Sequence, residues 1–317
     1  MKILITGIAG FIGSHLGEKL VQEHRIVGLD NFNDFYPPEQ KWQNVHYLQQ
    51  KGRFTLVQGD IRNRQFLAEL FTRENFDLVI HLAAMAGVRP SIANPVLYTE
   101  VNVGGTQNLL EICRELGVKK FILASSSSIY GNNRKLPFAE DDKVDNPISP
   151  YAATKRAAEL LCSVYHQLFG LSILALRFFT VYGPRQRPDL AIIKFARKIM
   201  AGEPIPVFGD GSSSRDYTYV DDIIDGIEQA VEYLSGHVCW EIFNLGESRT
   251  ISLLEMIAAL EKGLGIQARK EFLPTQPGDV QITYADLHKS RQVLGYDPST
   301  GFEQGIAKFL NWLQEQP

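Results

Sequence analysis

Tyr151 and Lys155 stand four residues apart in the segment SPYAATKRAAELL, shortly after the serine cluster Ser125 to Ser128. At the start of a helix this spacing places both side chains on one face. A nearby ammonium group favours the phenolate and lowers the pKa of a phenol from about 10, so Tyr151 could act as a general base. A second pair with the same spacing, Tyr47 and Lys51, is expected on a solvated helix face. The pattern therefore predicts chemistry only where a serine hydroxyl, the phenol and the ammonium group can meet at one reacting oxygen.

Two arginines in the loop TVYGPRQRPD, Thr180 to Asp189, form a second candidate group. The net charge of −4 gives the protein no general attraction for anions, so Arg185 and Arg187 indicate a local anion site. A planar guanidinium can bind a carboxylate through two parallel hydrogen bonds. Arginines at the rim of a cleft can also contact only a phosphate, and the residues by themselves leave this choice open.

The N-terminal segment has the pattern of a dinucleotide-binding turn. Gly7, Gly10 and Gly13 follow the apolar run KILIT and precede a helical pattern, so a pyrophosphate could lie at the helix N-terminus. The next expected strand, RIVGLD, ends in Asp30, where a carboxylate binds ribose hydroxyls and repels a 2′-phosphate. NAD is therefore predicted rather than NADP, although Asp30 could also simply begin the turn DNFND.

The elements that must position these groups are βα units. Apolar runs at FTLVQGDI, DLVIHLAA and KFILASSSS alternate with amphipathic helices, which predicts a Rossmann-type, doubly wound parallel sheet in an α/β protein. After Thr180 the pattern changes to turn-rich segments, which indicates a smaller, discontinuous C-terminal α/β substrate lobe. We expect residues 1–178 and 216–245 to bind NAD, and residues 179–215 and 246–317 to bind the substrate.

Composition excludes several other classes of protein. The 317 residues are 44% hydrophobic and 21% charged, as in a globular enzyme, and the charge does not favour nucleic acid. The three cysteines form no CxxC pattern, and the seven histidines form no HExxH motif, so no metal site is predicted. The sequence shows no signal-peptide cleavage site and no apolar run of about 18 residues. We expect a cytoplasmic protein without a membrane partner.

From GIAGFIG through YAATK to GDGSSSRDYTYVDD and QPGDVQITYADLHKS, the sequence resembles the extended short-chain dehydrogenase/reductases that act on nucleotide sugars. Within that superfamily, the segments NFNDFY, AGVR, LRFFTVYGP, RPD and GDVQITYAD are similar to UDP-glucuronate 4-epimerases. The resemblance covers essentially the whole chain. It implies a homodimer that pairs through the helices around 102–116 and 152–169.

The resemblance also implies roles for individual residues. The catalytic residues would be Ser126, Tyr151 as the base, and Lys155 as its partner. The cofactor would contact Tyr151 and Lys155 together with Gly7, Gly10, Phe11, Ile12, Gly13, Asp30, Asn31, Asp60, Ile61, Leu82, Ala83, Ala84 and Asn102. The UDP-sugar would contact Arg89, Ser127, Thr180, Arg187, Arg215, Gln276 and Asp279.

The segment SSSSIYG favours one reaction of this superfamily. The related 4,6-dehydratases have an acidic residue pair before their Val-Tyr-Gly, because elimination of water needs an additional acid and base. Here the corresponding positions offer only hydroxyls. The site is therefore expected to remove a hydride from C4 of a UDP-sugar and return it to the opposite face, with NAD bound throughout.

The same resemblance favours UDP-glucuronate, converted to UDP-galacturonate, as the substrate. Arg187 would bind the sugar carboxylate, with support from Thr180. UDP-glucose, UDP-galactose or an N-acetylhexosamine remains the alternative, because the small Thr283 stands where narrow-pocket epimerases have a Tyr. A dehydratase, a reductase or a non-catalytic NAD-binding regulator is less favoured, because Ser126, Tyr151 and Lys155 occur together without the acidic pair.

Overall fold

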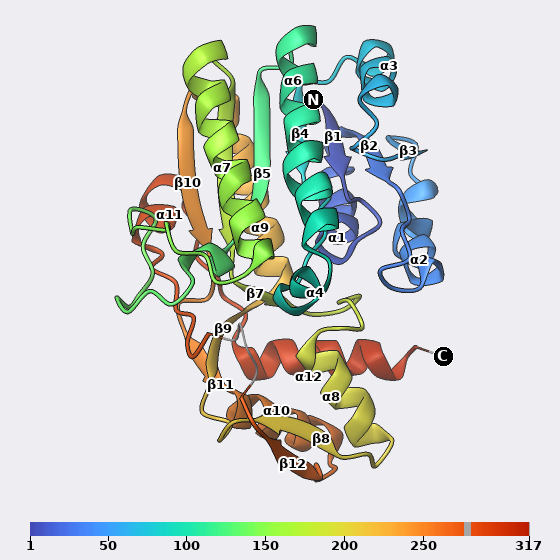
Figure 1. The fold of residues 1–317 in the computed structure, drawn as a ribbon. Coiled ribbons are helices and arrows are strands. Elements are labelled where there is room, and N and C mark those ends of the chain that lie inside the picture. Colours follow the sequence, from blue (N-terminus) through green and yellow to red (C-terminus); the bar gives the residue numbers. More distant parts are fainter. Residues whose placement is uncertain (276–279, 317) are drawn as a thin grey trace.

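A seven-stranded parallel sheet forms the centre of the protein. The computed structural model describes residues 1–275 and 280–316. The strands are β1 (Lys2–Thr6), β2 (Arg25–Asp30), β3 (Phe54–Gln58), β4 (Leu78–His81), β5 (Lys120–Ser126), β6 (Ser172–Phe178) and β10 (Trp240–Leu245). Their order is β10-β6-β5-β4-β1-β2-β3, and every neighbouring pair is parallel (Figure 1). This arrangement confirms the predicted fold class.

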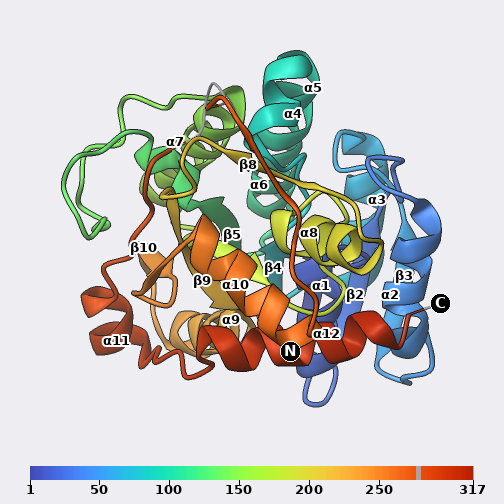
Figure 2. The same cartoon turned by 90° about the horizontal axis from the view of Figure 1, so that it is seen from below.

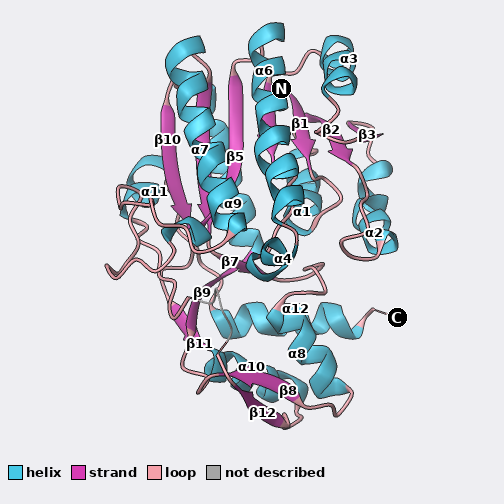
Figure 3. Ribbon diagram, viewed as in Figure 1, coloured by secondary structure: helices cyan, strands magenta, loops and turns pink. Residues whose placement is uncertain are grey.

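Helices cover both faces of the sheet (Figure 3). One face is covered by α1 (Phe11–Leu20), α2 (Pro38–Gln49) and α9 (Val220–Gly236). The other face is covered by α3 (Arg64–Glu74), α6 (Gly105–Leu116) and α7 (Pro150–Phe169), with α6 and α7 side by side. Short helices α4 (Val88–Ala93) and α5 (Pro95–Tyr98) lead into a π-helical turn, η1 (Thr99–Gly104), that precedes α6. The helix expected around 102–116 is therefore α6, which begins as a regular α-helix at Gly105, after the π-helical turn.

The C-terminal lobe lies beyond the carboxyl ends of the strands (Figures 1 and 2). It contains a two-stranded sheet of β8 (Ile205–Phe208) and β12 (Lys270–Leu273), with helices α8 (Ala191–Met200), α10 (Leu253–Leu264) and α12 (Phe302–Gln314). A three-stranded sheet of β7 (Thr180–Tyr182), β9 (Ser214–Tyr219) and β11 (Thr250–Ser252) links it to the main sheet. Helix α11 (His288–Leu294) packs on β10 and α9. The chain thus rejoins the main sheet through α9 and β10, after β9.

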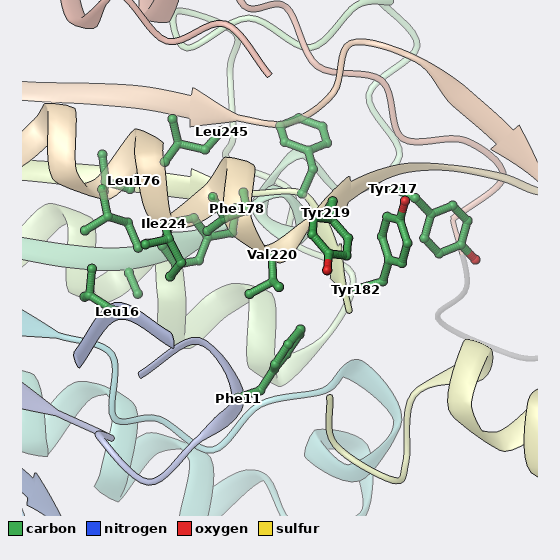
Figure 4. Close-up of a cluster of buried hydrophobic side chains, with 14 of the residues drawn as sticks. Phe11, Leu16, Leu176, Phe178, Tyr182, Tyr217, Tyr219, Val220, Ile224 and Leu245 are labelled. Carbon is green, nitrogen blue, oxygen red and sulfur yellow. The ribbon is translucent and has the colours of Figure 1, made fainter. Parts of the chain in front are cut away.

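One hydrophobic core extends from the main sheet into the C-terminal lobe. Leu176 of β6 and Leu245 of β10 belong to the same buried cluster as Tyr182, Tyr217 and Tyr219 of the linking sheet (Figure 4). The ring of Tyr182 packs at about right angles to that of Tyr217, with centroids 6.2 Å apart. Because burial of apolar side chains drives this packing, the lobe is held against the cofactor-side sheet by a continuous core. Among the described residues, no helix is long and apolar enough to span a membrane.

Candidate active site

A cavity of about 490 Å³ lies where the carboxyl ends of the parallel strands meet the C-terminal lobe. This is the usual ligand position in a doubly wound sheet, and the volume is in the range of small-molecule sites. Nineteen of the predicted catalytic, cofactor-binding and substrate-binding residues contribute to its wall. They are Gly7, Gly10, Phe11, Ile12, Gly13, Asp30, Asn31, Asp60, Ile61, Leu82, Ala83, Ala84, Ser126, Ser127, Tyr151, Lys155, Thr180, Arg187 and Arg215.

The glycine turn between β1 and α1 is too tight for side chains. Gly7 has a φ of +75°, and a Cβ there would lie 2.8 Å from the backbone nitrogen of Ala83. A Cβ on Gly13 would lie 2.1 Å from the carbonyl oxygen of Gly7. Helix α1 begins directly after Gly10 and has no acidic residue in its first turn. Its positive N-terminal end therefore faces the cavity without a competing carboxylate, as a pyrophosphate requires.

Two carboxylates lie at neighbouring strand ends on this side of the cavity. Asp30 accepts hydrogen bonds from the backbone N–H groups of Ala9 and Phe32, at 3.1 and 2.9 Å. Burial raises the pKa of Asp30, and these donors act in the opposite direction. Asp60 is paired with Arg62, whose hydrogen bonds lower the pKa of Asp60 to about 2. Asn31 donates to Asp60 at 3.0 Å, so the two strand ends are linked by side chains.

Local structure brings the proposed catalytic side chains together. Ser149 caps α7 by accepting from the backbone N–H of Ala152, so Tyr151 lies in the first turn and Lys155 one turn later. The hydroxyl of Ser126 hydrogen-bonds with Tyr151. Lys155 donates from Nζ to the carbonyl oxygen of Ala124 at 2.8 Å, and its Nζ lies 6.0 Å from the ring centroid of Tyr151. Hydroxyl, phenol and ammonium groups thus meet at the end of β5.

The charges around Tyr151 differ from the sequence expectation. Burial raises the pKa of Tyr151, while the hydrogen bond with Ser126 and the positive charge of Arg187 lower it. Burial also lowers the pKa of Lys155 to about 8, and the Glu159 carboxylate acts in the opposite direction. Desolvation therefore outweighs the expected effect of the lysine on the phenol. Arg187, which lies 36 residues after Tyr151 in the chain, is the cation that favours the phenolate.

A buried ion pair lies beneath these side chains. Glu159 is one turn after Lys155, and Arg177 of β6 donates to its two carboxylate oxygens at 3.0 Å each. Their side chains are 0% and 1% exposed. Ser125 donates to Glu159 at 2.6 Å, and Tyr130 accepts from Arg177 at 2.9 Å. The pair therefore ties α7 to β5 and to the turn η2 (Ser127–Tyr130) on both sides of Ser126.

Arg187 reaches the cavity from the loop after β7. Asp189 accepts from its Nε and Nη2 at 2.9 and 3.0 Å, and the guanidinium lies over the ring of Phe35. Its Nη2 lies 4.0 Å from the position that a Cβ on Gly87 would take. A guanidinium has five N–H groups, and Asp189 binds two of them, on Nε and Nη2. The edge formed by Nη1 and the second N–H of Nη2 can still bind another carboxylate.

Hydroxyls, and not carboxylates, lie beside Tyr151, the proposed catalytic base. Among the described residues of the cavity wall, the only carboxylates are Asp30 and Asp60, at the ends of β2 and β3. Ser126 ends β5, and Ser127 and Ser128 follow it in η2. The hydroxyl oxygen of Ser128 is buried with no hydrogen-bond partner among the described residues. An elimination would need an acid and a base beside the sugar, which this wall does not offer at that position.

Four predicted site residues do not belong to the cavity wall that the structure describes. Asn102 is 2% exposed and bonds to the backbone N–H and carbonyl of Met85, so it supports a residue of the wall. Arg89 lies over the ring of Phe208, with 4.9 Å from its guanidinium carbon to the ring centroid. Gln276 and Asp279 lie outside the described residues.

The segment around the start of α2 contributes residues that the sequence did not single out. Phe35, Tyr36 and Lys41 line the cavity. Lys41 is 5% exposed and donates from Nζ to the backbone and side-chain oxygens of Asn33, at 2.6 and 2.8 Å. One signal was present, since Lys41 shares a helical stripe with apolar residues four and seven positions later, where a lysine is unusual.

Comparison with known proteins shows similarity over nearly the whole chain. The family model of GDP-mannose 4,6 dehydratase matches residues 4–309. The UDP-glucuronate 4-epimerase of Thermodesulfobacterium geofontis is 45% identical over 314 residues, which are 98% of this chain and 96% of the relative.

Solved structures agree with this similarity. The UDP-glucuronic acid 4-epimerase of Bacillus cereus, in complex with UDP-glucuronic acid and NAD, has a TM-score of 0.94 and 39% identity, with 99% of each chain covered. The UDP-glucose 4-epimerase of Thermotoga maritima with UDP-glucose has a TM-score of 0.91 and 30% identity, also with 99% of each chain covered.

Proposed function

The chain belongs to the GDP-mannose 4,6-dehydratase family of extended short-chain dehydrogenase/reductases, and we propose that it interconverts UDP-glucuronate and UDP-galacturonate. NAD-dependent 4-epimerisation of a UDP-sugar is supported by the similarity to the UDP-glucuronate and UDP-glucose 4-epimerases. The residues that line the cavity are compatible with the same activity. The observation that carries the choice of the acid is the guanidinium of Arg187, which lies in the same cavity as Tyr151.

The residues of the cavity fit NAD. The glycine turn and the N-terminus of α1 would hold the pyrophosphate, and the Asp30 carboxylate would accept from the adenosine ribose hydroxyls. A carboxylate in this position also disfavours a 2′-phosphate, so NAD is preferred over NADP. When bound, NAD supplies the acceptor and donor of the C4 hydride.

The protein's own residues would manage the proton and the sugar. Tyr151 accepts the proton of the 4-hydroxyl, Ser126 holds the same oxygen, and Lys155 keeps a positive charge nearby. The resulting 4-keto sugar must turn over within the cavity before Tyr151 returns the proton. Because the end of β5 offers only hydroxyls, it lacks the additional acid and base that elimination of water from the keto sugar would need.

Arg187 would identify the acid by its carboxylate. The bound Asp189 fixes the plane of the guanidinium and leaves its Nη1–Nη2 edge for the sugar, while Thr180 of β7 lies in the same wall. A neutral hexose has a hydroxymethyl group in that position, and it cannot form the bidentate, charge-assisted pair.

The test is a comparison of kcat/KM for UDP-glucuronate and UDP-glucose in the wild type, Arg187→Met and Arg187→Lys. Loss of a buried, charged hydrogen bond costs about 2 kcal/mol, so Arg187→Met should lose about thirtyfold more on the acid than on the neutral sugar. A loss common to both sugars would report the charge of Arg187 beside Tyr151. Arg187→Lys keeps the charge without the planar fork, so its kcat/KM for UDP-glucuronate should lie between those of the wild type and Arg187→Met. Equal losses of Arg187→Met on both sugars would show that Arg187 does not read the carboxylate.

A neutral UDP-hexose is the second candidate substrate. Thr283 lines the cavity and accepts a hydrogen bond from the backbone N–H of Asp216 at 3.0 Å. Its small side chain is compatible with a neutral or N-acetylated sugar as well as with the acid. The same two-substrate assay decides, because a neutral-sugar enzyme would show the higher kcat/KM for UDP-glucose in the wild type.

Dialysed protein distinguishes an epimerase from a reductase or a regulator. An epimerase that retains NAD turns over without added cofactor, whereas a reductase consumes NADH and a regulator does neither.

We also propose that the domain limits given from the sequence separate the NAD-binding and UDP-sugar-binding parts of the chain.

We propose a homodimer and a reducing, cytoplasmic setting. Helices α6 and α7 expose several large apolar side chains, namely Leu116, Leu160, Val164, Leu168 and Phe169. An apolar surface of this kind is typical of an interface with a second copy. The three cysteines are unpaired, as in reduced proteins. Sedimentation of the purified enzyme tests the dimer.

A further inference from the structure

Arg185 lies two residues before the proposed carboxylate-binding Arg187 and takes no part in the cavity wall as described. We propose that Arg185 is a positioning residue, which clamps the loop of Arg187 onto helix α1 through an ion pair with Glu18. The inference deepens the proposed function and rests on it for the role of Arg187.

The ion pair joins parts of the chain that are 167 residues apart. Arg185 donates from Nη2 to Oε2 of Glu18 at 2.7 Å. The two side chains are 23% and 26% exposed, so both are largely shielded from water. A charge-assisted hydrogen bond of this length is stronger than a neutral one, and partial burial reduces its screening by salt.

Two further hydrogen bonds fix the same loop to cofactor-side helices. His15, one turn of α1 before Glu18, bonds through Nε2 to the carbonyl oxygen of Pro184 at 3.0 Å. Burial lowers the pKa of His15 to about 4, with a further contribution from Arg185, so the ring is neutral near pH 7. Because a carbonyl only accepts, Nε2 of His15 carries the hydrogen and donates it. Gln40 of α2 donates to the carbonyl oxygen of Gln186 at 3.5 Å.

The backbone at Arg185 needs such support. Its φ is +62°, in the left-handed region that residues with a Cβ rarely adopt. A non-glycine residue in that region costs of order 1 kcal/mol or more, so the surrounding contacts must hold it there. The side chain of Gln186 is 1% exposed, which leaves this part of the loop packed against the protein.

The clamp would set the position of Arg187 relative to the cofactor. Helix α1 carries Glu18 and His15, and its N-terminus faces the cavity at Gly10. One rigid helix would therefore locate both the pyrophosphate of the cofactor and the guanidinium that holds the sugar carboxylate.

The experiment uses the holoenzyme and the variants Arg185→Gln, Glu18→Gln, their combination, and Arg185→Lys. Lys19→Gln is the matched control, because Lys19 lies on the same helix but pairs with Asp225 and Glu228 of α9, at 3.5 and 3.0 Å. Two quantities are measured: the ratio of kcat/KM for UDP-glucuronate to that for UDP-glucose, and hydrogen exchange of the backbone amides in 183–190.

We expect each single substitution to Gln to lower the acid-to-neutral ratio about fivefold, as for loss of a partly buried ion pair. The double variant should be no worse than either single one, since both remove the same interaction. Arg185→Lys should recover most of the ratio, and Lys19→Gln should match the wild type. Hydrogen exchange in 183–190 should accelerate in the Gln variants alone.

Additive losses, equal losses on both sugars, or unchanged exchange in 183–190 would each overturn the clamp. Failure of the wild type to epimerise UDP-glucuronate would instead refute the proposed function. In that case the exchange measurement, which needs no substrate, still decides whether Arg185 and Glu18 hold the loop.

Discussion

Removal of the buried guanidinium of Arg177 is the sharpest test of how the catalytic elements are held together. Arg177→Met leaves the Glu159 carboxylate, which is 0% exposed, with Ser125 at 2.6 Å and Arg156 at 3.2 Å as its remaining partners. Breaking one side of a buried pair costs about 3–5 kcal/mol, because a charge stays in the interior without full compensation.

That cost can be expressed as a change in melting temperature. The unfolding entropy is about 2.1 cal/mol/K per residue, or roughly 0.67 kcal/mol/K for a chain of this length. We therefore expect the Tm of Arg177→Met to fall by roughly 5–7 °C, measured by calorimetry with NAD in fixed excess. The double variant Arg177→Met with Glu159→Met removes both charges and should recover part of this loss.

The exposed pair of Lys19 and Glu228 is the control. Their side chains are 43% and 32% exposed, so Lys19→Gln should cost less than about 1 kcal/mol and shift the Tm by less than about 2 °C. The reasoning would be refuted if Arg177→Met shifted the Tm no more than Lys19→Gln does. A double variant as unstable as the sum of its single variants would show that the ion pair itself contributes nothing.

Three further outcomes are expected. Tyr151→Phe should abolish turnover of the UDP-sugar while NAD remains bound, seen by absorbance of the released cofactor; substantial residual activity would exclude Tyr151 as the base. Gly13→Ala should lose bound NAD, because its Cβ would lie 2.1 Å from the carbonyl oxygen of Gly7, and a variant with full NAD content would contradict this geometry. In the pH profile, kcat/KM should decline above about pH 8, where Lys155 loses its proton. Glu159→Gln removes a charge that raises the pKa of Lys155, so the decline should move to lower pH, and a shift to higher pH would reverse the assignment.

Much of the architecture was predictable because its signals are local. The runs KILIT and RIVGLD form β1 and β2 over the same residues, Lys2–Thr6 and Arg25–Asp30, since continuous apolar runs bounded by glycine or turn residues are typical of buried parallel strands. The glycine turn and the helix start at Ser149 follow from backbone sterics and capping within a few residues. Tyr47 also behaves as expected, being 47% exposed on α2, whereas Lys51 lies beyond the end of that helix with its Nζ 4.1 Å from the centroid of the Tyr47 ring.

The sequence by itself determined the order of the functional groups along the chain: a glycine turn, an acid at the next strand end, serines, and a tyrosine with its lysine. Only the tertiary structure decided which charges face one another, because those pairs join distant segments. Lys41 enters the cofactor side of the cavity, Arg187 is the cation that favours the phenolate of Tyr151, and Arg185 meets Glu18 across 167 residues. Periodicity records which side of a helix or strand is buried, whereas the partner of a buried charge and the desolvation that shifts its pKa depend on how the elements pack.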